Sequence, residues 1–551
     1  MGLLRRLACI ISLLVFICSL FTVVASIALL LFGSLPLGLS QGLRVRVALF
    51  ALIAIVSGVV LKKCLSIPQI SHSDTPQSAI RNPQSPGSGI HHLMFIAGLL
   101  FAALLVFPHL DVYPWAAPDE MHHLVVAKNL SVHGEYASGS PERGFKRFDA
   151  YDSVGPAVIV PVALAFKVLG VSVWSARMVM ALYFLALCIA AYWFVKPAFG
   201  NVAGLISLFL APMAFSSIYL GRTLYGEVPA WCFLLLGLSV WRCALQPGKY
   251  WLGLPAGILF GLAILCKAIL VLAAFPALGV WAFDRLSHKR LGWITVVLPV
   301  IGAAGMVGGW LGIVRWFGSS SGTTGGTWGL YQHYLLFGLA PAWHEFQKTL
   351  MMYPLTHLVL LAAILSILTI PFFLRYDPPT VFLMLCAGFF AYWWLFFTPG
   401  QLPRYLWYCY VTAGICLGIS LRLFLAQGRW LTLRVITAVV LVLPFLSWTG
   451  HQAKEVYTNK EMRAETALAQ YISGLPAHAK IATTFPPLCN SLLFLTGRIV
   501  DAGDPQNALL ATYDLVIHRE PVSSISSPEE RIGPYILVKN SDKLLQQSKQ
   551  P

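Results

Sequence analysis

Acidic residues are the first candidates for chemistry, because they are few and unevenly placed. Twelve precede position 450, and seven of these fall within residues 111–153. They are Asp111, Asp119, Glu120, Glu135, Glu142, Asp149 and Asp152. A transporter is expected to bury ionisable residues at mid-membrane, as substrate or ion-coupling sites. Acids that gather in one stretch between apolar runs instead favour an active site at a water interface.

The elements that position these acids must be membrane helices. The chain is 58% hydrophobic and 11% charged, whereas an ordinary soluble domain is roughly 25% charged. Repeated apolar runs of about 20 residues exclude a soluble enzyme, a disordered scaffold and a coiled coil. The formal net charge is +16, but Lys and Arg stand singly or in short groups between apolar runs, which argues against a nucleic-acid partner. The 11 Cys form no CxxC pair and are expected to be small core residues.

We therefore predict an α-helical polytopic membrane protein with about 13 transmembrane helices. The apolar runs are 8–33, 44–61, 92–110, 174–195, 201–220, 227–245, 250–267, 268–283, 291–314, 354–375, 379–397, 405–427 and 431–449. With the N-terminus inside, the inner segments carry fifteen Lys and Arg against three Asp, which is the orientation that the positive-inside rule favours. This topology requires residues 154–170, which contain Pro156 and Pro161, to lie along the interface without spanning.

Composition divides the chain into four parts. Residues 1–63 are a two-helix membrane addition, and residues 64–91, rich in Ser, Pro, Gln and His, are a cytoplasmic linker. Residues 92–449 form the membrane body, with outer loops at 111–173 and 315–353. Residues 450–551 are predicted to be a small outer α/β domain. Its signals are an amphipathic pattern near 460–473 and strand-like runs at Ile481–Phe485, Tyr513–Ile517 and Tyr535–Val538.

Short motifs follow one another in order on the predicted outer face. The first is PDEMHHLVVAKNL from Pro118 to Leu130, and Gly134 follows it. The later ones are Gly155-Pro156, Ser175-Ala176-Arg177, Tyr225-Gly226-Glu227-Val228-Pro229, Gly261-Leu262-Ala263 ahead of Lys267, and Pro403-Arg404-Tyr405. Over about 92–430, the chain resembles the GT-C membrane glycosyltransferases. It is most similar to the bacterial branch that includes protein O-mannosyltransferases and the lipid A aminoarabinose transferase.

The resemblance implies an inverting transfer of sugar from a polyprenyl-phosphate carrier to a hydroxyl acceptor, on the outer face of the plasma (inner) membrane. An acceptor hydroxyl needs a carboxylate within hydrogen-bond reach to take its proton. A departing lipid phosphate needs fixed positive charge. Asp119 is the candidate base, with Glu120 orienting or assisting it, and Lys267 and Arg404 are the candidates that hold the phosphate.

Four more residues are expected at the substrate site: Glu227, Asp152, Arg222 and Tyr405. Glu227 matches a position that is usually acidic in this family, but a structural ion pair with Arg222 explains it equally well. Asp152 lies near a second acidic position of the family, although its spacing to Pro156 differs. Tyr405 belongs to the late motif that carries Arg404.

Ordinary structural roles compete with these assignments. Lys267 could extend to water at the membrane edge, and Arg404 could anchor a helix at the interface. His122 and His123 point about 100° apart on a helix, so no metal site is predicted for them. No cofactor is certain, since carboxylates of this kind act with or without a divalent cation. The run from Gly318 to Gly329 is expected to be a lid, with Trp328, Tyr331 and Tyr334 able to stack on a sugar or lipid.

The expected partners are a polyprenyl-phosphate sugar donor, membrane lipids and an envelope acceptor that is a protein, a lipid or a polysaccharide. A flippase or transporter for lipid-linked sugars is the main alternative. It predicts an internal repeat and charges within the helices, and the sequence displays neither. An oligosaccharide ligase or polymerase, which moves a glycan chain in place of one sugar, fits the same motifs and stays open.

Overall fold

The computed structural model describes most of the predicted membrane body and parts of the tail. The described residues are 88–115, 117–142, 144–148, 154–287, 291–317, 377–397, 403–425, 431–458, 462–476, 479–483, 485, 487–502, 513–519, 530–532 and 535–539. The addition 1–63, the apolar run 354–375 and the predicted lid at 318–329 lie outside them.

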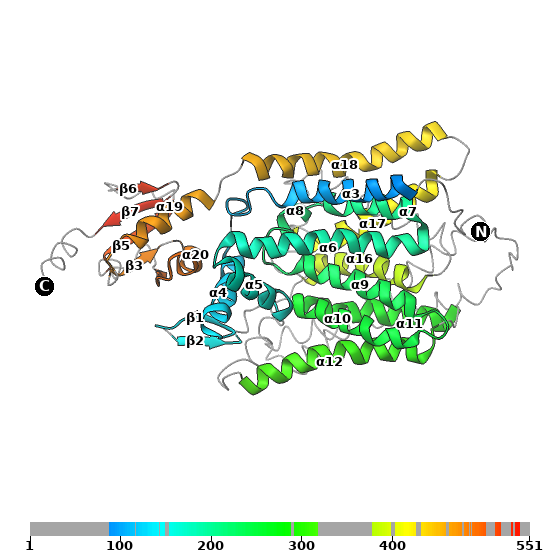
Figure 1. The fold of residues 1–551 in the computed structure, drawn as a ribbon, viewed down its shortest axis with the longest axis horizontal. Coiled ribbons are helices and arrows are strands. Elements are labelled where there is room, and N and C mark those ends of the chain that lie inside the picture. Colours follow the sequence, from blue (N-terminus) through cyan, green and yellow to red (C-terminus); the bar gives the residue numbers. More distant parts are fainter. Residues whose placement is uncertain are drawn as a thin grey trace, which may run out of the picture.

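Long apolar helices form a bundle whose members lie side by side along the long axis of the molecule (Figure 1). They are α3 (Ser88–Val106), α6 (Val173–Phe199), α7 (Asn201–Met213), α9 (Glu227–Ala244), α10 (Gly253–Cys266), α11 (Ala274–Ser287), α12 (Trp293–Phe317), α16 (Pro378–Phe397), α17 (Trp407–Leu425) and α18 (Leu431–Thr458). Among the described residues, five helical stretches are long and apolar enough to span a membrane. The expected total of about 13 stays a prediction.

One predicted membrane span is interrupted in the structure. The run 201–220 is not one helix, because α7 ends at Met213 and a turn leads into the short helix α8 (Ser217–Leu220). Ser216, just before α8, has the left-handed φ of 58°. The break leaves polar backbone groups and side chains between α7 and α8. One of these side chains, Ser217, accepts a hydrogen bond of 2.8 Å from Trp407 at the start of α17.

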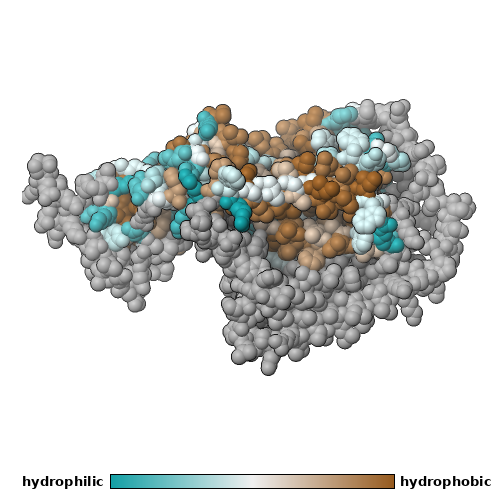
Figure 2. Space-filling view, turned by 90° about the horizontal axis from the view of Figure 1, so that it is seen from below, coloured by the Kyte–Doolittle hydropathy of each residue, from teal (hydrophilic) through white to brown (hydrophobic). Residues whose placement is uncertain are grey.

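The bundle buries aromatic side chains at its centre and exposes apolar ones at its surface. Trp231, Trp394 and Trp407 are among the largest fully buried side chains. By contrast, Leu93 on α3 and Trp316 on α12 are 68% and 83% exposed. Figure 2 shows hydrophobic residues over the middle of the helical part and hydrophilic residues toward its ends. Such a surface suits contact with lipid.

Shorter elements cover one end of the bundle. Helix α4 (Pro118–His133) starts with proline in its first turn and ends at Gly134, which has a φ of 72°. The hairpin of β1 (Ala137–Ser140) and β2 (Gly144–Arg147) follows, and then α5 (Pro156–Leu169), which packs against α4. With 14 residues, α5 is shorter than the about 20 that a spanning helix needs. These elements lie beside the tail domain (Figure 1).

The described tail is a small α/β unit, as the sequence pattern predicts. Helices α19 (Met462–Ser473) and α20 (Pro487–Thr496) accompany a mixed sheet in the order β4-β3-β5-β7-β6. The strands are β3 (Ile481–Thr483), β4 (Asp501–Ala502), β5 (Leu515–Arg519), β6 (Glu530–Ile532) and β7 (Tyr535–Lys539). Leu468, Leu492 and Leu537 share its apolar core. Helix α20 packs against α4, so the tail and the acidic stretch meet at the same end of the bundle.

Candidate functional site

The first turn of α4 presents Asp119 at the end of the bundle. Its side chain is 54% exposed, and its Oδ2 lies 2.9 Å from Nη2 of Arg404 in the helical turn η4 (Pro403–Leu406). The candidate base and one candidate phosphate ligand are therefore in direct contact. The carboxylate also lies in the first turn of α4, where the helix dipole interacts favourably with negative charge.

Arg404 is fixed by aromatic rings. Its guanidinium carbon lies 4.6 Å from the ring centre of Tyr225 and 5.3 Å from that of Tyr405. Its Nε is buried and has no hydrogen-bond partner among the described residues. Cation–π contacts hold the planar group without consuming its N–H donors. If Arg404 only anchored a helix at the interface, it would not need these ring contacts. An arginine that binds an anion needs a fixed guanidinium with an N–H donor still available.

A second charge pair lies nearby and is shut away from solvent. Lys267 Nζ lies 3.3 Å from Glu227 Oε1, and the two side chains are 4% and 0% exposed. Lys267 therefore does not extend to water at the membrane edge, which was the ordinary alternative for it. Lys267 follows the last residue of α10, and Glu227 opens α9. Hence both charges lie at helix ends, where the sequence topology expected Lys267.

Two glycines explain how these backbones approach each other. A Cβ on Gly155 would lie 2.2 Å from the carbonyl oxygen of Leu265, and one on Gly226 would lie 2.5 Å from that of Cys266. Gly226 also has a φ of +85°, which disfavours other residues. Val154 forms a β-bridge with Lys267, so the chain just after the acidic stretch pairs with the segment that carries this cation.

Arg222 has a different partner from the one expected. The sequence allowed an ion pair between Arg222 and Glu227, and this assignment is wrong, because Glu227 pairs with Lys267. Arg222 is fully buried and donates to the carbonyl oxygens of Val106, Pro108 and Tyr113, at 2.5 to 3.1 Å. It therefore braces the connection between α3 and α4, and the described contacts give it no place among the groups that surround Arg404.

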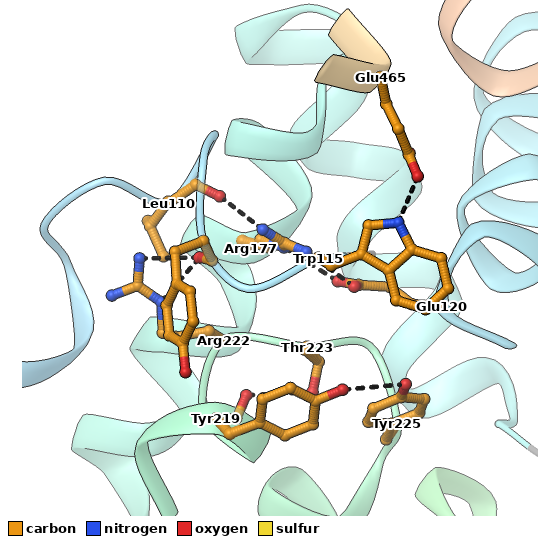
Figure 3. A network of polar contacts seen from close by, with 10 residues as sticks. Leu110, Trp115, Glu120, Arg177, Tyr219, Arg222, Thr223, Tyr225 and Glu465 are labelled. Carbon is orange, nitrogen blue, oxygen red and sulfur yellow. Dashed lines mark hydrogen bonds and ion pairs between the residues drawn. The ribbon is translucent and has the colours of Figure 1, made fainter. Parts of the chain in front are cut away.

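Glu120 belongs to the scaffold, next to Asp119 in sequence but on another face of α4. Arg177 of α6 donates to both of its oxygens, at 3.0 and 2.8 Å, and to the carbonyl of Leu110 at 3.0 Å (Figure 3). Both side chains are completely buried. A bidentate pair of this kind sets the angle of the first turn of α4. This geometry suits the orienting role expected of Glu120, because Arg177 occupies both of its carboxylate oxygens.

His123 is a site residue that the sequence reasoning missed. It stands four residues after Asp119 and so lies on the same helix face, one turn deeper. It is 1% exposed, and its Nδ1 has no hydrogen-bond partner among the described residues. Burial lowers the pKa of His123 well below its ordinary value of 6.5, and the nearby charges of His122, Lys267 and Arg404 lower it further. The imidazole is thus neutral, with one nitrogen able to accept a hydrogen bond.

The structure describes only some of the other residues that were expected at the substrate site. Tyr405 is buried beside Arg404, with its ring 5.5 Å from that of Trp393. Asp152 and the residues Trp328, Tyr331 and Tyr334 lie outside the described residues. Within the part of the chain that the structure describes, no group of three or more His, Cys, Asp and Glu could hold a metal ion.

Taken together, the described side chains put an accessible carboxylate beside two buried or half-buried cations. Asp119 and Glu227 are the anions, Arg404 and Lys267 are the cations, and His123 adds a neutral acceptor. A phosphate could replace a carboxylate as the partner of Arg404, and a freed Asp119 could then accept a proton from a hydroxyl. The arrangement suits general-base chemistry next to a departing anion.

Comparison with known proteins agrees with this architecture. Residues 153–307 match the profile of the family described as Dolichyl-phosphate-mannose-protein mannosyltransferase. No curated protein matches the chain in sequence. The fold is similar to the crystal structure of ArnT from Cupriavidus metallidurans in the apo state, with a TM-score of 0.58 and 13% identity over 84% of this chain and 99% of that one.

The same protein bound to undecaprenyl phosphate gives a TM-score of 0.56 and 13% identity, over 82% of this chain and 98% of that one. These matches confirm the predicted resemblance to the GT-C membrane glycosyltransferases, whose fold this chain has.

Proposed function

We propose that this chain, with its GT-C fold, is a membrane glycosyltransferase that moves a sugar from a polyprenyl-phosphate carrier to an acceptor hydroxyl. The observation that carries the proposal is the contact between Asp119 and Arg404 beside the buried pair of Lys267 and Glu227. The family profile that matches residues 153–307 supports it, as does a structural neighbour that binds undecaprenyl phosphate.

The proposed reaction starts when the lipid phosphate approaches Arg404 and Lys267. Arg404 exchanges the carboxylate of Asp119 for the singly charged phosphodiester of the donor, whose negative charge grows as the polyprenyl phosphate departs. Glu227 keeps Lys267 ionised in its buried place, since an isolated buried ammonium would lose its proton. The phosphate is thus held by fixed charges before any bond breaks.

Asp119 then acts as the general base. The acceptor oxygen attacks the anomeric carbon from the face opposite the phosphate, and its proton passes to Asp119. The bond between the anomeric carbon and the phosphate oxygen breaks, and the electron pair leaves with the polyprenyl phosphate. The anomeric configuration inverts in this single displacement. We place the site on the outer face of the plasma membrane, on the strength of the charge distribution.

Release of polyprenyl phosphate tests the proposal. The purified full chain in nanodiscs would be supplied with polyprenyl-phosphate sugars and with an extract of envelope acceptors. The proposal expects release of polyprenyl phosphate together with a glycosylated product. Movement of the intact lipid-linked sugar between leaflets without its cleavage would replace this proposal with the flippase alternative. Mass spectrometry of products would separate the transfer of one sugar from that of a glycan chain.

A further inference from the structure

The tail domain holds the segment that leads into the candidate base. Residues 107–117, which connect α3 to α4, contact α19 at two points. The backbone N–H of Met462 donates to the carbonyl of Val112 at 3.1 Å, and the indole N–H of Trp115 donates to Oε1 of Glu465 (Figure 3). Trp115 stands only four residues before Asp119, so these contacts lie next to the proposed chemistry.

Glu465 joins three elements at one carboxylate. It lies on α19, is 1% exposed, and accepts a second hydrogen bond of 3.2 Å from the hydroxyl of Tyr535 on β7. An exposed salt bridge contributes little to rigidity, whereas a buried carboxylate with two directed donors fixes both of them. The indole of Trp115 is thereby tied to the sheet of the tail as well as to its first helix.

The opposite side of the same segment is held by the membrane bundle. Arg222 binds the carbonyls of Val106, Pro108 and Tyr113, and Arg177 binds Leu110. The bundle thus binds the segment from Val106 to Tyr113, and the tail binds it at Val112 and Trp115. Only two residues of sequence separate Trp115, which the tail holds, from Pro118, the first residue of α4.

A second tail contact reaches α4 itself. Lys128 Nζ donates to the carbonyls of Phe494 and Leu493 at 3.0 and 3.5 Å, near the C-terminus of α20. The same ammonium lies 5.8 Å from the ring centre of Phe494. A cation at a helix C-terminus is favourable, so α20 and α4 are joined by charge as well as by packing. The tail therefore contacts α4 directly and also the segment before it.

We propose that Trp115 and Glu465 are positioning residues, through which the tail domain sets the place of Asp119 in the site. The proposal rests on the proposed function for its activity readout. Neither residue touches substrate or reacting atoms in this account. A shift of about 1 Å in a reacting group can cost about 100-fold in rate, so loss of this tie should lower kcat more than it changes donor KM.

A double-mutant cycle tests the hydrogen bond between Trp115 and Glu465. Trp115→Phe removes the indole N–H while it keeps an aromatic ring, and Glu465→Ala removes the acceptor. Each should lower kcat by about 10- to 100-fold, with donor KM changed by less than about 3-fold. The double variant should be no worse than the more damaging single one, because both remove the same bond. Effects that multiply, or unchanged kcat in both single variants, would overturn the proposal.

Two matched variants control for general damage. Glu465→Gln keeps an oxygen that accepts from both donors, so it should restore most of the kcat lost in Glu465→Ala. Gln470→Ala changes an exposed residue of α19 and should leave kcat unaltered. Trp115→Phe lies outside the tail and cannot act by unfolding α19, which keeps the test decisive if Glu465→Ala folds poorly.

Hydrogen exchange provides a readout that does not depend on activity. Amides in residues 107–120 should exchange faster in Trp115→Phe and in Glu465→Ala than in the wild type, while those in α9 should not. Faster exchange in the two variants, together with a wild type that releases no polyprenyl phosphate from any donor, would keep the Trp115–Glu465 contact and reject the proposed function. Unchanged exchange with an active wild type would reject the tie alone.

Discussion

Asp119 and Arg404 are 285 positions apart in the chain, yet their side chains meet at 2.9 Å. The contact joins the first turn of α4 to the turn η4, just before α17, at the end of the bundle that carries the tail. It also means that the proposed base and the proposed phosphate ligand neutralise each other in this structure. Donor binding is expected to separate them, because the phosphate and the carboxylate of Asp119 compete for Nη2 of Arg404.

Arg404→Gln should weaken the binding of a polyprenyl-phosphate analogue. A charge-assisted hydrogen bond contributes about 1.5 to 3 kcal/mol, so the Kd should rise by about 10- to 100-fold. Asp119→Asn should leave Kd nearly unchanged or lower it, since it removes the competing anion. Binding would be measured by titration in nanodiscs. Equal affinity in Arg404→Gln and wild type would return Arg404 to the role of an interface anchor.

Lys267 and Glu227 should behave as one unit. Glu227→Gln leaves a buried ammonium without its counter-ion, which favours loss of its proton and so of its charge. Donor affinity should then fall almost as much as in Lys267→Met, and the double variant should not be additive. The same titration in nanodiscs would measure donor affinity in Glu227→Gln, in Lys267→Met and in the double variant. Normal donor affinity in Glu227→Gln would separate the two residues and leave Glu227 a role of its own.

The pair of Glu120 and Arg177 should govern stability more than rate. Removing one partner of a buried pair costs about 3 to 5 kcal/mol, because the other charge stays buried without compensation. Glu120→Gln and Arg177→Met should each lower the thermal midpoint in detergent. Glu120→Leu combined with Arg177→Met should recover much of the loss. A catalytic defect in Glu120→Gln with an unchanged midpoint would instead give Glu120 a chemical role.

His123 should make stability depend on pH in the acidic range. Its pKa is lowered in the folded chain, so below its ordinary value of 6.5 the unfolded chain binds the proton more readily. Stability should therefore fall as the pH drops below about 6.5. His123→Asn should reduce this fall in the thermal midpoint, whereas His122→Asn, at the less buried neighbour, should not. Equal pH profiles in His123→Asn and wild type would contradict the assignment.

Sequence patterns indicated which charged residues stand at helix ends, because charge among apolar runs is a strong signal. Asp119, Lys267 and Arg404 stand at the ends of predicted helices, and the structure brings all three to one end of the bundle. Arg177 belongs to the motif Ser175-Ala176-Arg177, for which the sequence alone indicates no role. Its place in the first turn of the apolar run 174–195 indicates a polar contact at that end of the helix.

Pairing was harder to predict than location. Glu227 pairs with Lys267, 40 positions away, and not with its near neighbour Arg222, because the turn after α8 aims Arg222 at backbone carbonyls. The hydrogen bond between Trp115 and Glu465 joins residues that are 350 positions apart, and neither segment has a periodic sequence pattern that predicts it. Such contacts depend on how the tail docks on α4, and local residue spacing says nothing of that.

The transfer rate of Asp119→Asn, measured with saturating donor in single-turnover reactions, tests the central claim most directly. Asparagine keeps the shape of the side chain but cannot accept the acceptor hydroxyl's proton. The account predicts normal expression and donor binding, with a rate lowered by about 10² to 10⁴, the usual contribution of a positioned base. A rate near that of the wild type in Asp119→Asn would contradict the account.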